Sequence, residues 1–210
     1  MTERSELIEL HNRLSKTLDE ERVAAKEKRH DKGYRTAREN LDDLIDRDSF
    51  VEYGQLAIAA QKSRREIEEL RTETAADGII TGFGKINGDI LQDSKALSAI
   101  IINDYSVLAG TQGYYHHKKL DRICETAEKQ NLPVIMYTEG GGGRPGDTDV
   151  HVQFAGLNIP SFSNWAKLRG KSIRIAVNNG YCFAGNAALF GTADFCISTK
   201  NSWLGMAGPA

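Results

Sequence analysis

The chain has 210 residues with 27 basic and 29 acidic side chains, and its formal net charge is −2. This balance argues against a protein devoted to nucleic acid, which needs a basic surface, and no apolar run reaches the roughly 18 residues that suggest a membrane span. The charged start, MTERSELIEL, lacks the apolar core of a secretion signal, and three cysteines without metal-ligand spacing favour reduced thiols. We therefore expect a cytoplasmic protein with no metal, nucleic-acid or membrane partner.

The first part of the chain predicts helices with charged surfaces. Leucines recur at three- and four-residue steps, as on one amphipathic helix that runs to about Lys28: Leu7, Leu10, Leu14 and Leu18. We therefore divide the chain into an N-terminal amphipathic helix, residues 1–30, and a domain, residues 31–210.

A second helix is expected over residues 36–45, because Thr36 and Glu39 have capping-box spacing in front of an apolar face. A short extended stretch, residues 49–54, follows this helix. Residues 61–73 suit a solvated helix or a linker, and nothing catalytic is needed to explain their charges.

The rest of the chain alternates strand and helix patterns. Residues 78–91 resemble two short strands joined by Asn87-Gly88, a strong hairpin signal, and residues 96–104 form an apolar run typical of a strand buried on both faces. The later expected elements are a helix over 116–131, a strand over 134–138, a helix over 163–170, a strand over 171–177, a helix over 184–193 and a strand over 194–199. Such alternation predicts an α/β sheet with helical crossovers.

Two glycine-rich loops follow predicted strands. The segment YTEGGGGRPGD contains four consecutive glycines, Gly140–Gly143, and the segment NNGYCFAGNAA turns at Asn178–Gly180 before a helix of small residues. A helix start of this kind leaves backbone N–H groups uncovered, and two facing loops can direct two such donors at one carbonyl oxygen, an oxyanion hole. The alternative is that the glycines only permit tight turns and close packing.

These residues also carry a resemblance. The segment VNNGYCFAGNAALFGTADFCIST resembles the signature of the crotonase (enoyl-CoA hydratase) superfamily. In order along the chain, DKGYRTARENLDDLIDRDSFVEYG, DGIITGFGKINGD, YSVLAGTQGYYHHKKLDRICETAEKQNLPVI, GGGGR and GYCFAGNA resemble the beta-type carboxyltransferase subunits of biotin-dependent acyl-CoA carboxylases. The similarity begins near residue 31 and covers only the N-terminal half of such a carboxyltransferase. It implies a crotonase-like (ClpP/crotonase) α/β fold of stacked ββα units, preceded by N-terminal helices.

The resemblance implies a site that binds acyl-CoA and stabilises its enolate during carboxyl transfer from carboxybiotin. The expected backbone oxyanion donors are Gly142, Gly143, Gly185 and Asn186. The expected substrate-binding residues are Gly141, Arg144, Tyr181 and Phe183, and no metal is expected. Arg144 leaves two interpretations open, a contact to a CoA phosphate or a carboxylate, and an ion pair that fixes the loop.

The sequence departs from the family pattern at both loops. The family commonly has Ser-Gly-Gly-Ala-Arg where this chain has four glycines and Arg144, and Tyr181 and Phe183 are bulkier than the family's residues, which changes the shape expected for the acyl pocket. Hydratases of the superfamily place a catalytic Glu three residues after the oxyanion-hole glycine. Here that position is Ala188, which cannot move a proton, so a hydratase is disfavoured.

The same resemblance implies the partners. Biotin would be carried on a partner domain or protein, and the substrate would be a CoA thioester. Expected partners are the biotin carboxyl carrier and biotin carboxylase components, a C-terminal carboxyltransferase half, and further copies in a homo-oligomer. Because the chain ends in small residues, GMAGPA, after a predicted strand, we expect a truncated sequence that holds only half of the active unit. The alternatives are a non-catalytic CoA-binding or assembly subunit, and another crotonase-type enzyme such as an acyl-CoA decarboxylase or hydrolase.

Overall fold

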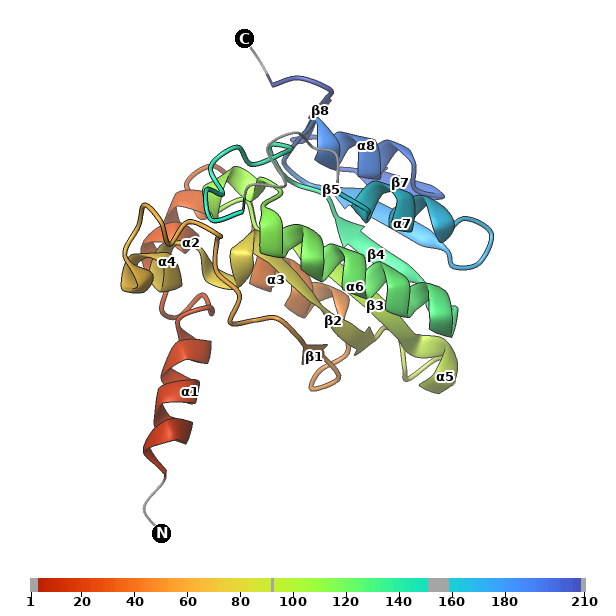
Figure 1. The fold of residues 1–210 in the computed structure, drawn as a ribbon. Coiled ribbons are helices and arrows are strands. Elements are labelled where there is room, and N and C mark those ends of the chain that lie inside the picture. Colours follow the sequence, from red (N-terminus) through yellow and green to blue (C-terminus); the bar gives the residue numbers. More distant parts are fainter. Residues whose placement is uncertain (1–3, 92, 151–158, 209–210) are drawn as a thin grey trace.

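A mixed six-stranded sheet, in the order β1-β2-β3-β4-β5-β7, forms the centre of the molecule (Figure 1). The computed structural model describes residues 4–91, 93–150 and 159–208. The strands of this sheet are β1 (Val51–Glu52), β2 (Ile79–Lys85), β3 (Leu97–Asn103), β4 (Val134–Tyr137), β5 (Arg174–Asn178) and β7 (Phe195–Ser198). The pairs β1–β2 and β2–β3 are antiparallel, whereas β3, β4, β5 and β7 run parallel.

Helices cover both faces of the sheet, with α6 on one face and α3 on the other (Figure 1). The helices are α1 (Ser5–Ser15), α2 (Val23–His30), α3 (Ala37–Leu44), α4 (Ile67–Glu73), α5 (Asp93–Ala96), α6 (Tyr114–Gln130), α7 (Ser161–Lys167) and α8 (Gly185–Gly191). A second, parallel sheet pairs β6 (Tyr181–Phe183) with β8 (Trp203–Gly205). Within the described ranges, every helix is too short or too polar to cross a membrane.

The core consists of two apolar layers that share β3. Ile101 packs with Ile123 of α6 and with Trp165 of α7, while Ile100 and its neighbours on the other face pack with Leu41 of α3. Successive strand residues point to opposite faces, so a strand between two helical layers has to be apolar at nearly every position. The prediction for residues 96–104 is confirmed.

Several predicted helices and strands are confirmed within a few residues. The capping box before α3 is present, because the Thr36 side-chain oxygen accepts the Glu39 N–H at 3.0 Å and the Glu39 carboxylate accepts the Thr36 N–H at 2.9 Å. The helix predicted over 116–131 is α6, which starts at Tyr114 and ends before Asn131 in the left-handed conformation. The strands β6 and β8 were not predicted.

The single N-terminal helix predicted over residues 1–30 is wrong. The chain leaves helical geometry after α1 and starts a second helix, α2, at Val23. Thr17 ends the first helix, since its hydroxyl donates to the Leu14 carbonyl at 2.7 Å and accepts a hydrogen bond from Gln55 at 2.6 Å. Contacts to the rest of the domain therefore end the helix despite the leucine pattern. The helix α1 extends away from the domain and has no buried residue (Figure 1).

The hairpin predicted within residues 78–91 is also wrong. Residues after β2 form a helical turn instead of a strand, in which the N–H groups of Ile90 and Leu91 donate to the Asn87 carbonyl at 3.0 and 2.8 Å. The Asp46 carboxylate accepts the N–H groups of Asn87 and Gly88, which fixes this turn. The antiparallel partner of β2 is β3, farther along the chain.

Candidate active site between two glycine loops

The two loops that the sequence singles out lie side by side and are hydrogen-bonded to each other. The glycine loop, Gly140–Gly143, follows β4, and the second loop carries β6 and the start of α8. The Gly140 N–H donates to the Tyr181 carbonyl at 2.6 Å, and the Phe183 N–H donates to the Gly140 carbonyl at 2.8 Å. The expectation that the loops face each other is therefore confirmed.

Three of the four glycines have close contacts inside the protein or a left-handed backbone. A side chain at Gly140 would collide with the Asn186 carboxamide and with the Gly110 carbonyl, and one at Gly141 would press on Thr111 at 3.1 Å. Gly142 has a φ of +89°, a left-handed conformation that L residues rarely adopt. Crowding and backbone conformation thus explain these three positions.

Gly142 and Ala184 form a second close approach between the two loops. A Cβ atom on Gly142 would lie 2.6 Å from the Ala184 Cβ and 3.5 Å from the Gly185 nitrogen. Ala184 itself has φ 49° and ψ −118°, an unusual conformation for a residue with a side chain. Gly143 differs from the other three glycines, because a Cβ there would meet no atom within 4 Å.

The predicted oxyanion donors divide into two groups. The Gly142 N–H donates to the Asn186 side-chain oxygen at 3.0 Å in a buried contact, so Gly142 is not a free donor and its assignment is corrected. Asn186 is fully buried and braces the glycine loop through its side chain, rather than offering an accessible amide. Gly143 is exposed and Gly185 is half-buried, and neither N–H has an acceptor within the described part of the chain. These two amides are the remaining donors.

Arg144 follows the ion-pair interpretation. Its guanidinium is buried, pairs with Asp77, lies 3.5 Å from Asp147, and donates to the Thr111 carbonyl at 2.7 Å. Burial raises the pKa of Asp77, and the adjacent Arg144 charge acts in the opposite direction. The donors of this guanidinium are thus occupied by partners within the domain. The structure gives no support to a phosphate contact by Arg144.

A second buried ion pair lies directly beneath the glycine loop. Arg29 of α2 donates to both oxygens of Glu139, at 2.9 and 2.6 Å, and its guanidinium lies 5.0 Å from the Tyr34 ring centre and 5.5 Å from that of Tyr105. Burial raises the pKa of Glu139, although the Arg29 charge lowers it. Glu139 is therefore committed to Arg29 and is not a free acid or base. This pair was not predicted, because neither segment of the sequence contains a local pattern that indicates the other as its partner.

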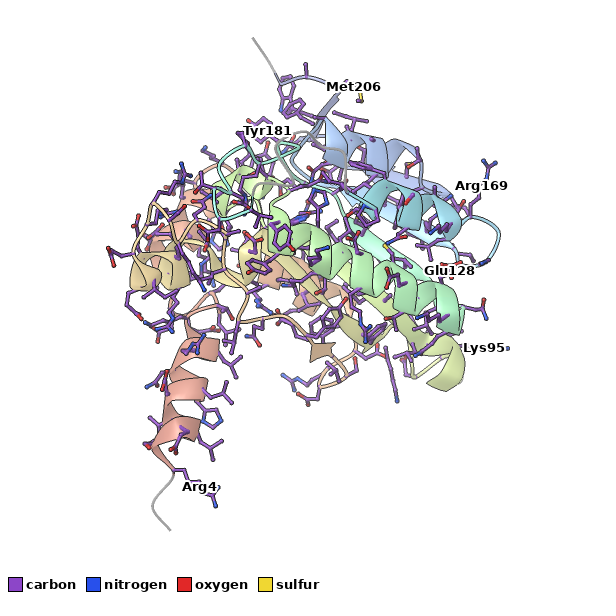
Figure 2. The ribbon with its side chains drawn as sticks, in the orientation of Figure 1. Arg4, Lys95, Glu128, Arg169, Tyr181 and Met206 are labelled. Carbon is purple, nitrogen blue, oxygen red and sulfur yellow. The ribbon has the colours of Figure 1, made fainter. Side chains whose placement is uncertain are left out.

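Tyr181 and Phe183 form an aromatic wall beside the loops. The Tyr181 ring stacks on Trp203 with centres 6.5 Å apart and lies 5.6 Å from the Tyr105 ring. Figure 2 shows Tyr181 close to the point where the second loop meets the glycine loop. Ala188, at the position of the hydratase carboxylate, lies in α8, where Gly185–Gly191 includes no acidic residue. The carboxylate that a hydratase needs at this position is therefore absent from α8.

A cavity of about 600 Å³ opens next to the wall, between α2 and the segment after β3. Tyr181 and Ala109 line it, and both are bonded to the glycine loop, since Gly141 donates to the Ala109 carbonyl at 2.9 Å. Lys28 and Lys32 also line it, and neither has an acidic partner within the described ranges. Its volume suits a ligand of cofactor size.

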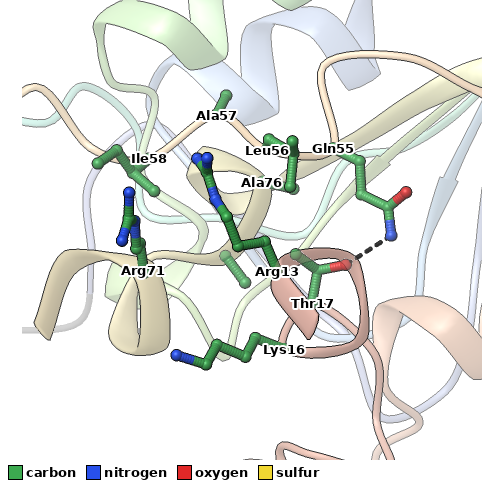
Figure 3. A pocket seen from close by; sticks show the side chains of 10 residues that line it. Arg13, Lys16, Thr17, Gln55, Leu56, Ala57, Ile58, Arg71 and Ala76 are labelled. Atoms are coloured by element: carbon green, nitrogen blue, oxygen red, sulfur yellow. Dashed lines mark hydrogen bonds between the residues drawn. The ribbon is translucent and has the colours of Figure 1, made fainter. Parts of the chain in front are cut away.

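Two other hollows are less suited to a ligand of that size. The pocket between α1 and α4 (Figure 3) contains Arg13 and Arg71, but its volume of about 10 Å³ holds about one water molecule. A cavity of about 340 Å³ lies against Tyr34 and Asn179. Among the described side chains, no cluster of His, Cys, Asp and Glu could hold a metal ion.

Residues 28–210 match the family model described as the carboxyl transferase domain. The chain belongs to this family. It is 31% identical over 210 residues to the biotin-dependent acetyl-/propionyl-coenzyme A carboxylase beta5 subunit of Mycobacterium leprae, covering 99% of this chain and 36% of that protein. It is 31% identical over 206 residues to the methylmalonyl-CoA decarboxylase subunit alpha of Veillonella parvula, covering 96% of this chain and 37% of the relative. The chain thus spans about a third of the length of these curated relatives.

Solved structures show the same architecture. A single-chain, multi-domain long-chain acyl-CoA carboxylase is 50% identical, with a TM-score of 0.93 over 99% of this chain and 20% of that one. Transcarboxylase 12S, solved as a hexamer with methylmalonyl-CoA and methylmalonic acid bound, is 25% identical, with a TM-score of 0.78 over 100% of this chain and 38% of that one. The predicted crotonase-like carboxyltransferase fold is confirmed.

Proposed function

We propose that this chain forms the acyl-CoA half of a carboxyltransferase in a biotin-dependent acyl-CoA carboxylase. The observation that carries the proposal is the pair of amides without an acceptor, Gly143 and Gly185, on two loops that are hydrogen-bonded together beside a large cavity. In this proposal both N–H groups donate to the thioester oxygen, and the CoA moiety occupies the cavity. Lys28 and Lys32 attract its phosphates.

The chemistry needs an acyl group whose α-carbon can lose a proton and accept a carboxyl group. As charge moves onto the thioester oxygen, the Gly143 and Gly185 amides stabilise it more strongly than they stabilise the neutral carbonyl. Hydrogen bonds from Gly140 and Phe183 hold the loops together, so little reorganisation is needed during the reaction. Carboxybiotin supplied by a carrier protein would provide the carboxyl group.

Direct binding tests the proposal. Calorimetry with acetyl-, propionyl- and palmitoyl-CoA should detect saturable binding that weakens with salt, because phosphate–lysine attraction is screened. Lys28→Glu and Lys32→Glu should each weaken binding about tenfold, equivalent to about 1.4 kcal/mol. Lys129→Glu, at the far end of α6, is the matched control and should bind like the parent. Lack of binding by the folded parent would refute the assignment.

The decarboxylase relative supports one second candidate, an acyl-CoA decarboxylase component, which would use the same thioester site. A hydratase is not proposed, because Ala188 offers no acid or base. Biotin carriers, a C-terminal half, a homo-oligomer and a cytoplasmic location complete the proposal. Free cysteines at all three described positions support the location, and the hexamer named for transcarboxylase 12S supports the oligomer.

A further inference from the structure

The side chain of Gln112 lies between the two loops of the candidate active site. Its backbone is bonded to the glycine loop on both sides, since the Gln112 N–H donates to the Gly142 carbonyl at 2.7 Å and its carbonyl accepts the Arg144 N–H at 2.9 Å. Its side-chain oxygen would be 2.7 Å from a Cβ atom on Gly185, so the carboxamide rests against the first residue of α8. The carboxamide is thus adjacent to a proposed oxyanion donor.

Gln112 carries a buried donor with no acceptor. Only 4% of the residue is exposed, and its Nε2 has no hydrogen-bond partner within the part of the chain that the structure describes. The Nδ2 of Asn186, next to the glycine loop, is in the same situation. A buried amide donor without an acceptor is costly, and natural proteins retain such groups where a ligand or an ordered water completes them. A bound group with acceptor oxygens would complete the Gln112 donor.

We propose that Gln112 Nε2 donates a hydrogen bond to the carboxylate that distinguishes the carboxylated acyl-CoA from the acyl-CoA, making Gln112 a specificity-determining residue. This inference rests on the proposed function. The thioester oxygen already has Gly143 and Gly185 as donors, whereas the carboxylate, attached to the next carbon, has no donor assigned. A side chain in contact with Gly185 is within reach of that position.

The neighbouring charges favour a neutral donor in this role. The nearest guanidinium, Arg144, is committed to Asp77 and to the Thr111 carbonyl, so it has no donor free for the substrate. Glu139 is likewise committed to Arg29. A carboxamide stabilises a carboxylate less than a guanidinium does, so it distinguishes the two thioesters without holding the carboxylated one irreversibly.

The test compares two thioesters that differ by one carboxyl group, propionyl-CoA and methylmalonyl-CoA. Gln112→Leu removes the donor at similar volume, and we expect it to weaken methylmalonyl-CoA binding at least tenfold while propionyl-CoA binding stays within twofold. Gln112→Glu places a negative charge at the same position and should weaken methylmalonyl-CoA binding further. Calorimetry on the full chain gives the affinities, and thermal unfolding identifies any variant that fails to fold.

Equal losses for both thioesters in the two variants, or no loss in either, would overturn the proposal, because a donor completed only by water does not sense the carboxylate. Failure of the folded parent to bind either thioester would refute the proposed function itself, and the inference with it. If Gln112→Leu does not fold, Gln112→Met and Gln112→Glu replace it in the comparison. Both should weaken methylmalonyl-CoA binding more than propionyl-CoA binding.

Discussion

At the scale of single residues, the four glycines of the loop Gly140–Gly143 have different structural roles. A methyl group at Gly140 or Gly142 would collide with neighbouring atoms and one at Gly141 would crowd Thr111, whereas Gly143 borders open space. Adjacent glycines therefore have different roles: some allow close packing, and one faces open space. A sequence pattern marks the loop as special, but only the contacts around each Cα show which glycine has which role.

The first prediction separates these roles. Gly142→Ala should lower the free energy of unfolding by about 2–4 kcal/mol, because the new methyl meets the Ala184 Cβ and the left-handed backbone disfavours a side chain. Gly143→Ala, the matched control, should change it by less than about 0.5 kcal/mol. Chemical denaturation measures both.

The double variant sharpens this test. In the Ala184→Gly background the Gly142→Ala cost should fall, because the opposing methyl is gone and only the backbone penalty remains. An unchanged cost in that background would show that the contact with Ala184 does not limit the loop.

At the scale of elements, α2 is attached to the sheet by ion pairs rather than by an apolar face. Its only buried residue is Arg29, which pairs with Glu139, 110 residues away in sequence. Arg22, just before the helix, pairs with Asp104 at 2.8 Å. The α2 wall of the large cavity is thus tied to the residue that precedes the glycine loop, which links the proposed CoA site to the proposed oxyanion donors.

Replacing one member of the Arg29–Glu139 ion pair should lower the stability of the protein more than replacing both. Arg29→Met and Glu139→Met each leave a buried charge or carboxyl without its partner and should cost about 3–5 kcal/mol. The double variant Arg29→Met/Glu139→Met should cost clearly less than the sum, since an apolar pair can fill the aromatic surroundings. A double-mutant cycle from denaturation curves measures the coupling, and strict additivity would contradict it.

Local signals were sufficient to predict some elements and insufficient for others. Thr36 and Glu39 fix the start of α3 through neighbouring residues, so the capping box could be identified from spacing. The break after α1 depends on Gln55, and the turn at Asn87 depends on Asp46. Because these partners are distant in sequence, neither feature could be predicted from the residues around it. The free amides of Gly143 and Gly185 were predicted, whereas the bond that occupies Gly142 depends on how the Asn186 side chain is oriented.

At the scale of the whole molecule, the sheet is unevenly covered. The β2–β4 region lies between α3 and α6, but among the described strands β7 pairs only with β5, and it is exposed at all four positions. Large apolar side chains remain exposed at this end of the molecule: Phe195, Ile197, Trp203, Leu204 and Met206. Figure 2 shows Met206 beyond the sheet at this end. An uncovered strand with apolar neighbours is a site for association, which supports the proposed partners, a C-terminal half or further copies.

Buried histidines should make the stability of the whole molecule sensitive to acid. His117 lies in α6, its Nδ1 is 2.8 Å from the Ser161 hydroxyl oxygen, and burial lowers its pKa to about 4; burial also lowers the pKa of His116. The unfolded chain binds a proton on this imidazole near its ordinary pKa of 6.5, whereas the folded chain does so only near 4. Stability should therefore fall as the pH drops from about 6.5 to 4.

His117→Asn tests this acid sensitivity, because it keeps a donor toward Ser161 but cannot titrate. The pKa difference corresponds to roughly 3 kcal/mol, so the variant should gain up to that much relative to the parent as the pH falls from 7 to 4. Comparison at each pH is necessary, because burial raises the pKa of Asp77 and Asp121, and these carboxyls act in the opposite direction in both proteins. Denaturation midpoints across this range provide the measurement. Parallel curves for parent and variant would show that His117 is not the group that titrates.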